Sequence, residues 1–332
     1  MSGGIAQLVA IGAQDAHLVG QPEVSFFRSN YKRHTNFAQT VERQVVQGNP
    51  ASGGMSTVRF ERKGDMLGYV YVASRANATA NLKDYVSKVE LLIGGQVIDT
   101  QESEFMTDLA PVVMNQTNSK QAYDATAHYY VPLRFSFCEN AQSALPLIAL
   151  QYHDVELRIT WGTLTATDDM EVYAQFIHLD TDERTSMSST PQNMIITQTQ
   201  KAIASKSSTQ ELSFNHPMKY LVAKNITGEL TTAKMKLQIN GTDVSDAKSV
   251  QPHFTYTPVY YHTQNAAASN EVILIPFCLD TAKVQPTGSL NFSRLDSARI
   301  VSDGASFANT IYAVNYNILR IENGMGGLMY SN

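Results

Sequence analysis

A hairpin motif occurs twice in the chain, and this repetition limits the possible folds more than any other feature of the sequence. Residues 89–99 read as a strand, a two-residue turn and a second strand, and residues 235–245 repeat that form. The turns are Gly-Gly at 94–95 and Asn-Gly at 240–241, residue pairs that supply the positive φ angles of a tight hairpin. The sequence therefore predicts two units built around equivalent β-hairpins.

Two further landmarks recur in the same order. A Phe-Cys pair follows each hairpin, at 137–138 and 277–278, and a Leu-Arg-Ile triplet preceded by a tyrosine comes later, at 157–159 and 319–321. The two copies are 146 positions apart for the hairpins, 140 for the Phe-Cys pairs and 162 for the triplets. Each landmark is weak by itself, but their common order predicts a tandem duplication with loops of unequal length.

The composition is that of a folded protein with large cores. Hydrophobic residues make up 43% and charged residues 17% of the 332 residues. The net charge of −5 argues against a protein that wraps nucleic acid through its own bulk charge, and we expect no sequence-specific nucleic-acid binding. No apolar run reaches the ~20 residues that span a bilayer. Residues 1–10 carry no basic leader, so we expect no secretory signal and a reducing compartment.

Alternating side chains predict short strands over most of the chain. Within residues 155–161, Val, Leu, Ile and Trp alternate with polar residues, and residues 131–137 show the same alternation. Sustained helical periodicity is rare, and residues 82–89 or 103–115 are the segments predicted to hold short helices. Many short strands between Gly, Pro, Asn, Ser and Thr turns are typical of an all-β sandwich or barrel.

A polar, turn-rich stretch at residues 182–192 is predicted to link two β domains. The first domain then covers residues 25–181 and the second covers residues 193–332, sizes that suit single-core domains. Residues 1–24 are Gly-rich and weakly patterned, so we predict an N-terminal arm there. The two cysteines, Cys138 and Cys278, occupy matching places in the two halves, and we expect both to be buried, reduced and unpaired.

No residue pattern in the chain predicts catalysis. It lacks a Gly-rich phosphate loop ending in Lys-Ser or Lys-Thr, a Gly-x-Ser-x-Gly elbow and a His-Glu-x-x-His pair. His253 and His262 would need a converging third ligand to hold a metal, and Asp280 and Glu271 are the carboxylates near them in sequence. Histidines without metal-ligand spacing are typically structural, exposed or hydrogen-bonded on strands and loops. We therefore predict no catalytic, cofactor-binding or metal site.

The strongest charge feature is the run from Arg28 to His34, which directly follows the apolar residues Val24, Phe26 and Phe27. Short charge runs are commonly solvated strand ends. The alternative is a docking base for an acidic partner or a membrane surface. The candidate docking residues are Phe26, Phe27, Arg28, Lys32 and Arg33.

Several stretches resemble the major capsid proteins of nucleocytoplasmic large DNA viruses. The N-terminal signature combines Gly-Ala-Gln-Asp at 12–15, Leu-Val-Gly-Gln-Pro-Glu-Val-Ser-Phe-Phe at 18–27 and Tyr-Lys-Arg-His-Thr-Asn-Phe-Ala at 31–38. The other similar stretches are the hairpin at 90–99, Ala-Leu-Pro-Leu-Ile-Ala-Leu-Gln-Tyr-His at 144–153, Gly-Ser-Leu-Asn-Phe-Ser-Arg-Leu-Asp at 288–296, and the C-terminal residues 315–321 and 324–332. The resemblance thus extends from one end of the chain to the other.

This resemblance implies a tandem double jelly roll, which is two eight-stranded antiparallel β-sandwiches, preceded here by the N-terminal arm. Members of the family form homotrimers with a pseudo-hexagonal outline that tile an icosahedral shell, commonly over an inner membrane. The resemblance therefore implies a structural virion protein without enzymatic activity or cofactor, made in the host cytoplasm and located in the capsid. Its partners would be neighbouring capsomers, minor capsid proteins and the inner membrane.

For such a shell protein, we expect residues 1–24 to lie at the base of the capsomer. Phe26 and Phe27 would anchor this arm to the first barrel, and Arg28, Lys32 and Arg33 would face the interior or a subunit boundary. Two alternatives remain open. One is a minor capsid or virion-appendage protein of the same fold. The other is a carbohydrate-binding attachment module that uses an aromatic platform, for which the sequence offers Tyr256, Tyr260 and Tyr261.

Overall fold

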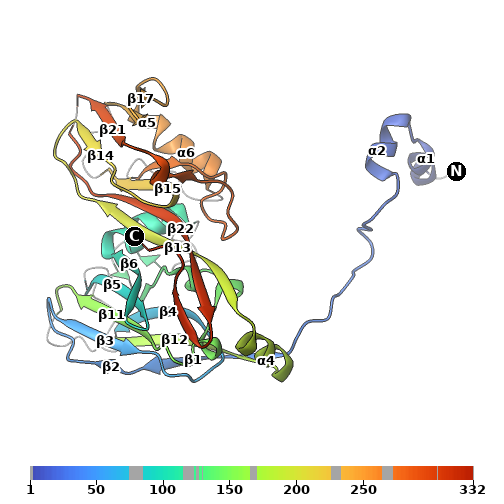
Figure 1. Cartoon of the computed structure of the whole chain (residues 1–332). Coiled ribbons are helices and arrows are strands. Elements are labelled where there is room, and N and C mark those ends of the chain that lie inside the picture. Colours follow the sequence, from blue (N-terminus) through green and yellow to red (C-terminus); the bar gives the residue numbers. More distant parts are fainter. Residues whose placement is uncertain are drawn as a thin grey trace. The chain divides into compact units, whose positions relative to one another are not determined.

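Residues 37–332 fold into antiparallel sheets whose strands follow the alternating pattern of the sequence (Figure 1). The computed structural model describes residues 3–74, 85–114, 123–124, 127–128, 130–164, 170–225, 233–263, 272–304 and 306–331. Within these residues, four larger sheets form two sandwiches that follow one another along the chain. Residues 1–36 form a separate unit.

The N-terminal unit contains short helices and extended backbone. Its elements are α1 (Gly3–Val9), η1 (Ala13–Asp15) and α2 (Ala16–Val19). No described residue from 3 to 36 is buried, because no core forms within a segment of this length and composition.

The first sandwich packs two antiparallel sheets around an apolar core, and neighbouring strands in each sheet are mostly not consecutive in sequence. Sheet 1 has the order β1 (Phe37–Gln44), β12 (Met170–Leu179), β4 (Met66–Ser74), β10 (Leu145–Pro146), with β9 (Tyr130–Pro132) also paired to β4. Sheet 2 has the order β2 (Val46–Gln47), β3 (Met55–Arg59), β11 (Val155–Trp161), β5 (Val86–Ile93), β6 (Gln96–Glu102). The alternation predicted for β11 is confirmed, because its Val, Leu, Ile and Trp side chains are buried and the residues between them are half-buried.

The second sandwich repeats this arrangement. Sheet 3 has the order β13 (Gln192–Ala202), β22 (Ile311–Glu322), β15 (Pro217–Lys224), β19 (Val272–Pro276), with β20 (Leu290–Asn291) paired to β15 and β23 (Met325–Leu328) paired to β22. Sheet 4 has the order β14 (Thr209–Glu211), β21 (Ala298–Asp303), β16 (Lys234–Ile239), β17 (Thr242–Asp243), with β18 (Lys248–Ser249) also paired to β16.

Short helical segments and a small two-stranded sheet connect these strands. They are η3 (Phe105–Leu109), α3 (Ala110–Val113), β7 (Tyr123–Asp124), β8 (Ala127–His128), η4 (Ser136–Cys138), η5 (Ala141–Ser143), η6 (Leu147–Ala149), α4 (Thr181–Ser189), α5 (Val250–His253), α6 (Tyr256–His262) and η7 (Phe292–Arg294). The helix predicted within residues 103–115 is confirmed by η3 and α3. The alternative at 82–89 is wrong from residue 86 onward, because β5 begins there; residues 82–84 lie outside the described part of the chain.

Both predicted hairpins are present. Residues 94–95 have φ values of 57° and 81°, and residues 240–241 have φ values of 49° and 78°. The residues that flank each turn pair with each other, Ile93 with Gln96 and Ile239 with Thr242. Two positive φ angles in a two-residue loop give the turn that matches the twist of the flanking strands.

The prediction that the two Leu-Arg-Ile triplets are equivalent is wrong. In sheet 2, Leu157 of β11 pairs with Leu91 of the first hairpin, and in sheet 4, Ile300 of β21 pairs with Leu237 of the second hairpin. The structural counterpart of the triplet at 157–159 is therefore in β21, whereas the triplet at 319–321 lies in β22 of sheet 3. A Leu-Arg-Ile triplet fits any strand with one buried face, so it could not distinguish the two sheets.

The described elements also bear on the predicted domain limits. Helix α4 lies within residues 181–189, where the linker is expected, and β13 begins at Gln192. The N-terminal unit extends to Asn36, beyond the arm of residues 1–24. The limits of the two sandwiches at 25–181 and 193–332 stay a prediction.

Candidate assembly surfaces

Helix α1 carries an apolar stripe that has no core to bury it. Ile5, Leu8 and Val9 follow the i, i+3, i+4 spacing of one helix face, and their side chains are 49%, 75% and 74% exposed. The sequence analysis describes this segment as weakly patterned and misses the stripe, although the i, i+3, i+4 spacing of its apolar residues indicates one. A helix with such a face needs a partner to bury it.

The predicted docking residues lie in the extended part of the same unit. Phe26 and Phe27 are 95% and 101% exposed, and Arg28, Lys32 and Arg33 are exposed as well. Two fully exposed aromatic rings next to a basic run are unusual for a surface that faces water alone. Their docking role stays a prediction.

The histidines named as metal candidates are not on strands or loops but at the ends of α5 and α6. Nδ1 of His262 lies 2.9 Å from the backbone oxygen of Cys278, and Asp280 accepts a hydrogen bond from the backbone of Ala282 and pairs with Lys283 at 3.6 Å. Glu271 lies outside the described residues. Among the described residues, no group of three or more His, Cys, Asp or Glu side chains is placed to hold a metal ion.

The two cysteines are unpaired, but they are not buried equally. Cys278 is 3% exposed, whereas Cys138 is partly buried against the hydrophobic core, so the prediction of full burial is wrong for Cys138. Burial raises the pKa of both thiols above the usual value, which disfavours the reactive thiolate.

The tyrosines of α6 do not make a flat platform. Tyr260 and Tyr261 are 77% and 72% exposed, but their rings meet at 85° with centroids 5.0 Å apart. Tyr256 is half-buried.

A second tyrosine cluster lies on the face of sheet 1 that points away from the core, and sequence reasoning missed it. Tyr71 of β4 stacks on Tyr173 of β12 with ring centroids 5.3 Å apart. The centroid of the Tyr71 ring also lies 6.4 Å from that of Tyr69 and 5.8 Å from that of Tyr130. The cluster forms because β4 and β12 pair Tyr71 with Tyr173, a contact between residues far apart in the sequence. We call these four residues the tyrosine face.

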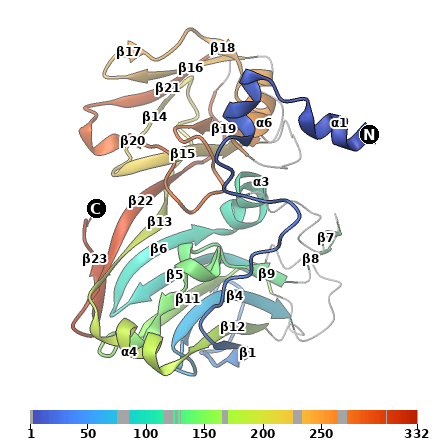
Figure 2. The same ribbon diagram turned by 90° about the vertical axis from the view of Figure 1, so that its right-hand side faces the viewer.

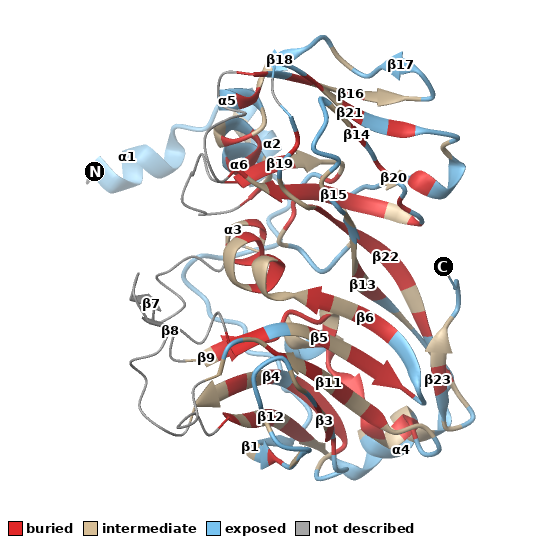
Figure 3. Ribbon diagram, turned by 90° about the vertical axis from the view of Figure 1, so that its left-hand side faces the viewer, coloured by how far each residue is buried: buried red, intermediate tan, exposed pale blue. Residues whose placement is uncertain are grey.

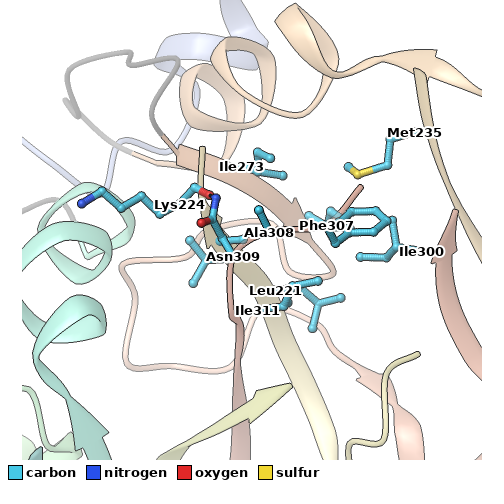
Figure 4. Close-up of a pocket in the computed structure, with 12 residues that line it drawn as sticks. Leu221, Lys224, Met235, Ile273, Ile300, Phe307, Ala308, Asn309 and Ile311 are labelled. Carbon is cyan, nitrogen blue, oxygen red and sulfur yellow. Dashed lines mark hydrogen bonds between the residues drawn. The ribbon is translucent and has the colours of Figure 1, made fainter. Parts of the chain in front are cut away.

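A cavity lies within the second sandwich, but it is too small for a ligand. Apolar side chains of Leu221, Met235, Ile273, Ile300 and Phe307 surround it (Figure 4). Its volume is about 20 Å³, enough for no more than a water molecule.

The junction between the two sandwiches is apolar at its centre. Phe105 of η3 is fully buried with its ring centroid 5.7 Å from that of Tyr312 on β22, and one continuous hydrophobic cluster includes residues of both sandwiches. Helix α3 lies between β6 and β15 at this junction (Figure 2). Strands β22 and β15 are buried along it (Figure 3).

Polar contacts surround this apolar centre. Asp99 of β6 accepts a hydrogen bond from the backbone N–H of Thr199 on β13 at 2.7 Å, Lys224 pairs with Asp108 at 2.6 Å, and the Thr281 hydroxyl donates to the backbone oxygen of Val113 at 2.8 Å. Burial is the main cause that raises the pKa of Asp99 to about 6, against the lowering effect of its three hydrogen-bond donors. The sandwiches are thus fixed to each other by matched contacts, not by the α4 connection alone.

No described helix is long and apolar enough to cross a membrane.

Two family models match consecutive parts of the chain. The model of the major capsid protein N-terminus matches residues 25–215, and the model of the large eukaryotic DNA virus major capsid protein matches residues 222–327. The major capsid protein of Pyramimonas orientalis virus is 32% identical over an alignment that covers all of both chains. The major capsid protein of Paramecium bursaria Chlorella virus 1 is 30% identical, again over all of both chains.

Solved structures agree with these matches. A chain from the quasi-atomic structure of the PBCV-1 virus capsid superposes with a TM-score of 0.80 at 26% identity, covering 93% of this chain and 100% of that chain. The Faustovirus major capsid protein superposes with a TM-score of 0.62 over 94% of each chain, but at 10% identity it supports the fold alone. Together with the four sheets, these similarities confirm the predicted all-β tandem double jelly roll.

Proposed function

The chain belongs to the family of large eukaryotic DNA virus major capsid proteins, and from this premise we propose that it forms the shell of a virion as a homotrimeric capsomer. Three copies would present six jelly rolls in a pseudo-hexagonal outline, and such units tile an icosahedral shell. The observation that supports this most is the similarity to major capsid proteins over the full length of the chain. The chain is a structural protein that assembles with other capsid subunits.

The buried junction between the jelly rolls supports a subunit that behaves as one block. Asp99, Lys224 and Thr281 tie the two sandwiches together across a continuous apolar cluster. A block of two similar lobes can repeat around a threefold axis as six nearly equivalent lobes. Closed rings of this kind come from a heterologous contact repeated by symmetry.

The N-terminal unit is the proposed docking element at the base of the capsomer. Its apolar stripe on α1, its exposed rings Phe26 and Phe27 and its basic residues Arg28, Lys32 and Arg33 suit a partner that is apolar and acidic. Neighbouring capsomers, minor capsid proteins and an inner membrane are the proposed partners. Synthesis in the host cytoplasm and the absence of enzymatic activity and of a cofactor belong to the same proposal.

The alternatives are a minor capsid or virion-appendage protein of the same fold, and a carbohydrate-binding attachment module. Tyr260 and Tyr261 give the second alternative little support, because perpendicular rings do not offer one flat surface to a sugar ring. The tyrosine face would be the better candidate for such a platform.

Light scattering and particle imaging test the proposal together. Purified protein at micromolar concentration in mild salt should have three times the mass of the chain, and imaging should show capsomers with a hexagonal outline. A stable monomer under these conditions would contradict the trimer. Trimers that occur at vertices or on appendages of virions, and not across the shell faces, would favour the minor-protein alternative.

A further inference from the structure

Arg134 is buried, although it occupies a polar position of the alternating segment at residues 131–137. It is 4% exposed, and its neighbours Leu133 and Phe135 are 2% and 1% exposed. The backbone N–H of Leu133 donates to the backbone oxygen of Val70 on β4 at 3.0 Å, and the side chain of Gln101 on β6 donates to the backbone oxygen of Arg134 at 2.8 Å. Both sheets of the first jelly roll thus hold the backbone around Arg134 and keep its side chain away from bulk water.

One edge of the Arg134 guanidinium has no hydrogen-bond partner. Nε and Nη2 are both buried, and neither has an acceptor among the described residues. These two nitrogens lie on the same side of the planar group, so their N–H bonds point in nearly the same direction. Arginine uses such a pair of donors to bind two oxygens of a carboxylate or phosphate at once. Because buried polar groups are normally hydrogen-bonded, this edge indicates a ligand with acceptor oxygens.

A second buried cation lies on the second jelly roll, at Lys219 of β15, which is 5% exposed. Its Nζ donates to the backbone oxygen of Lys283 at 2.8 Å and lies 6.0 Å and 5.8 Å from the ring centroids of Tyr220 and Tyr316. The hydroxyls of these two tyrosines are buried and also lack a partner among the described residues. This part of the junction therefore holds more hydrogen-bonding groups than the described side chains satisfy.

Glu139 is a carboxylate that acts on both cations. Burial raises the pKa of Glu139, and the charges of Arg134 and Lys219 oppose that rise. Asp280 also acts on Lys219, but it pairs with Lys283 at 3.6 Å. Two buried cations thus share one carboxylate, and one positive charge is left without compensation, which is strongly destabilising in a protein interior. A water molecule could accept hydrogen bonds from Arg134 but would not balance that charge.

We propose that Arg134 binds a small inorganic oxyanion, such as phosphate or sulfate, through Nε and Nη2. Two oxygens of the anion accept the two N–H bonds, and its negative charge compensates the cation that Glu139 leaves unbalanced. The anion thereby stabilises the junction where residues 136–138 contact β13. The inference does not depend on the proposed trimer, because every residue that it uses belongs to one chain.

The amount of anion bound by the wild-type protein is the first measurement. Protein purified without phosphate or sulfate is dialysed to equilibrium against inorganic phosphate in excess sodium chloride, which screens the attraction of phosphate to surface lysines. After rapid desalting, the protein is denatured and the released ions are measured by ion chromatography. We expect one phosphate per chain, or one sulfate retained from the cell.

Variants of Arg134 and a matched control locate the site. Arg134→Lys keeps the charge but loses the pair of donors, so it should bind phosphate at least about 10-fold more weakly. Arg134→Gln should bind none. Arg158→Lys is the control, because Arg158 is 37% exposed and pairs with Glu90 at 3.2 Å on the outside of β11. Phosphate should raise the thermal midpoint of the wild type and of Arg158→Lys, but not that of Arg134→Gln.

Glu139→Gln separates the proposed ligand from an internal partner. Removing this carboxylate takes away a negative charge that repels the anion, so phosphate binding should become tighter. Wild-type protein that neither retains an oxyanion nor takes up phosphate would overturn the proposal, even if the Arg134 variants fail to fold. Uptake that appears only in Glu139→Gln would also overturn it, because Glu139 would then be the partner of Arg134. Equal uptake by the wild type and both Arg134 variants would show adsorption at the surface and exclude this site.

Discussion

Asp99 shows how burial at a single residue makes stability depend on pH. It lies at the junction of the two jelly rolls and accepts hydrogen bonds from the backbone N–H groups of Thr100 and Thr199 and from Gln101. Burial nevertheless raises its pKa from 3.8 to about 6. A folded-state pKa above the unfolded one means that the native protein binds the proton more tightly. Asp99 therefore contributes stability below pH 3.8 that is lost as the pH rises through about 6.

Replacing Asp99 with asparagine should remove this dependence. On going from pH 4 to pH 8, wild type should lose about 3 kcal/mol of unfolding free energy that Asp99→Asn does not lose, because asparagine does not titrate. Urea unfolding at both pH values measures this difference. Asp243→Asn is a control of opposite sign, because a hydrogen bond from Lys236 lowers the pKa of Asp243 and its contribution is lost as the pH falls. Parallel pH profiles for wild type and Asp99→Asn would contradict the assignment.

Neighbouring glycines in the first hairpin should tolerate substitution differently. Both have positive φ, so alanine at either position should cost about 1–2 kcal/mol. A Cβ on Gly95 would have no atom within 4 Å, whereas a Cβ on Gly94 would lie 2.5 Å from Nδ1 of His153. That nitrogen lies 2.9 Å from the backbone oxygen of Gly326, a contact worth about 1 kcal/mol. Denaturant unfolding should show that Gly94→Ala is less stable than Gly95→Ala, and equal losses would contradict this reason.

At the scale of elements, the local turn signals of the two hairpins were read correctly, whereas the helical stripe of α1 and the pairing between distant strands were missed. The two hairpins were predictable because their turn residues are adjacent in sequence. The counterpart of β11 was missed because a buried-face pattern does not say which sheet a strand joins. Helix α6 was missed because its tyrosines favour strands, and it forms where Pro258 and Val259 are buried beside β19. The tyrosine face was missed for a similar reason, since it depends on the pairing of β4 with β12.

The N-terminal unit is the element whose removal should separate folding from assembly. Because no described residue from 3 to 36 is buried, deleting residues 1–20 should leave the thermal midpoint and the trimer unchanged. Assembly of trimers into shells should fail, since the apolar stripe of α1 is lost. Light scattering, thermal unfolding and particle imaging measure the three properties. Normal shells from the truncated protein would defeat the docking role and leave the basic run as a solvated strand end.

For the whole molecule, the continuous apolar cluster predicts that the two jelly rolls unfold together. Phe105→Ala removes a fully buried ring at the junction and should lower the free energy of unfolding by about 3–5 kcal/mol. Because the lost contacts join the two sandwiches, calorimetry should resolve two transitions in place of one.

The matched control for that variant is Phe214→Ala. Phe214 is 5% exposed and lies in the separate apolar cluster of the second jelly roll, with its ring 6.0 Å from that of Phe292. It should cost a similar free energy, since it also empties a buried aromatic site. The loss should then appear as a single transition at lower temperature, because the junction stays intact. If Phe105→Ala also unfolds in one transition, the apolar centre of the junction does not carry the coupling, and the α4 connection with the polar contacts of Asp99 and Lys224 must hold the two jelly rolls together.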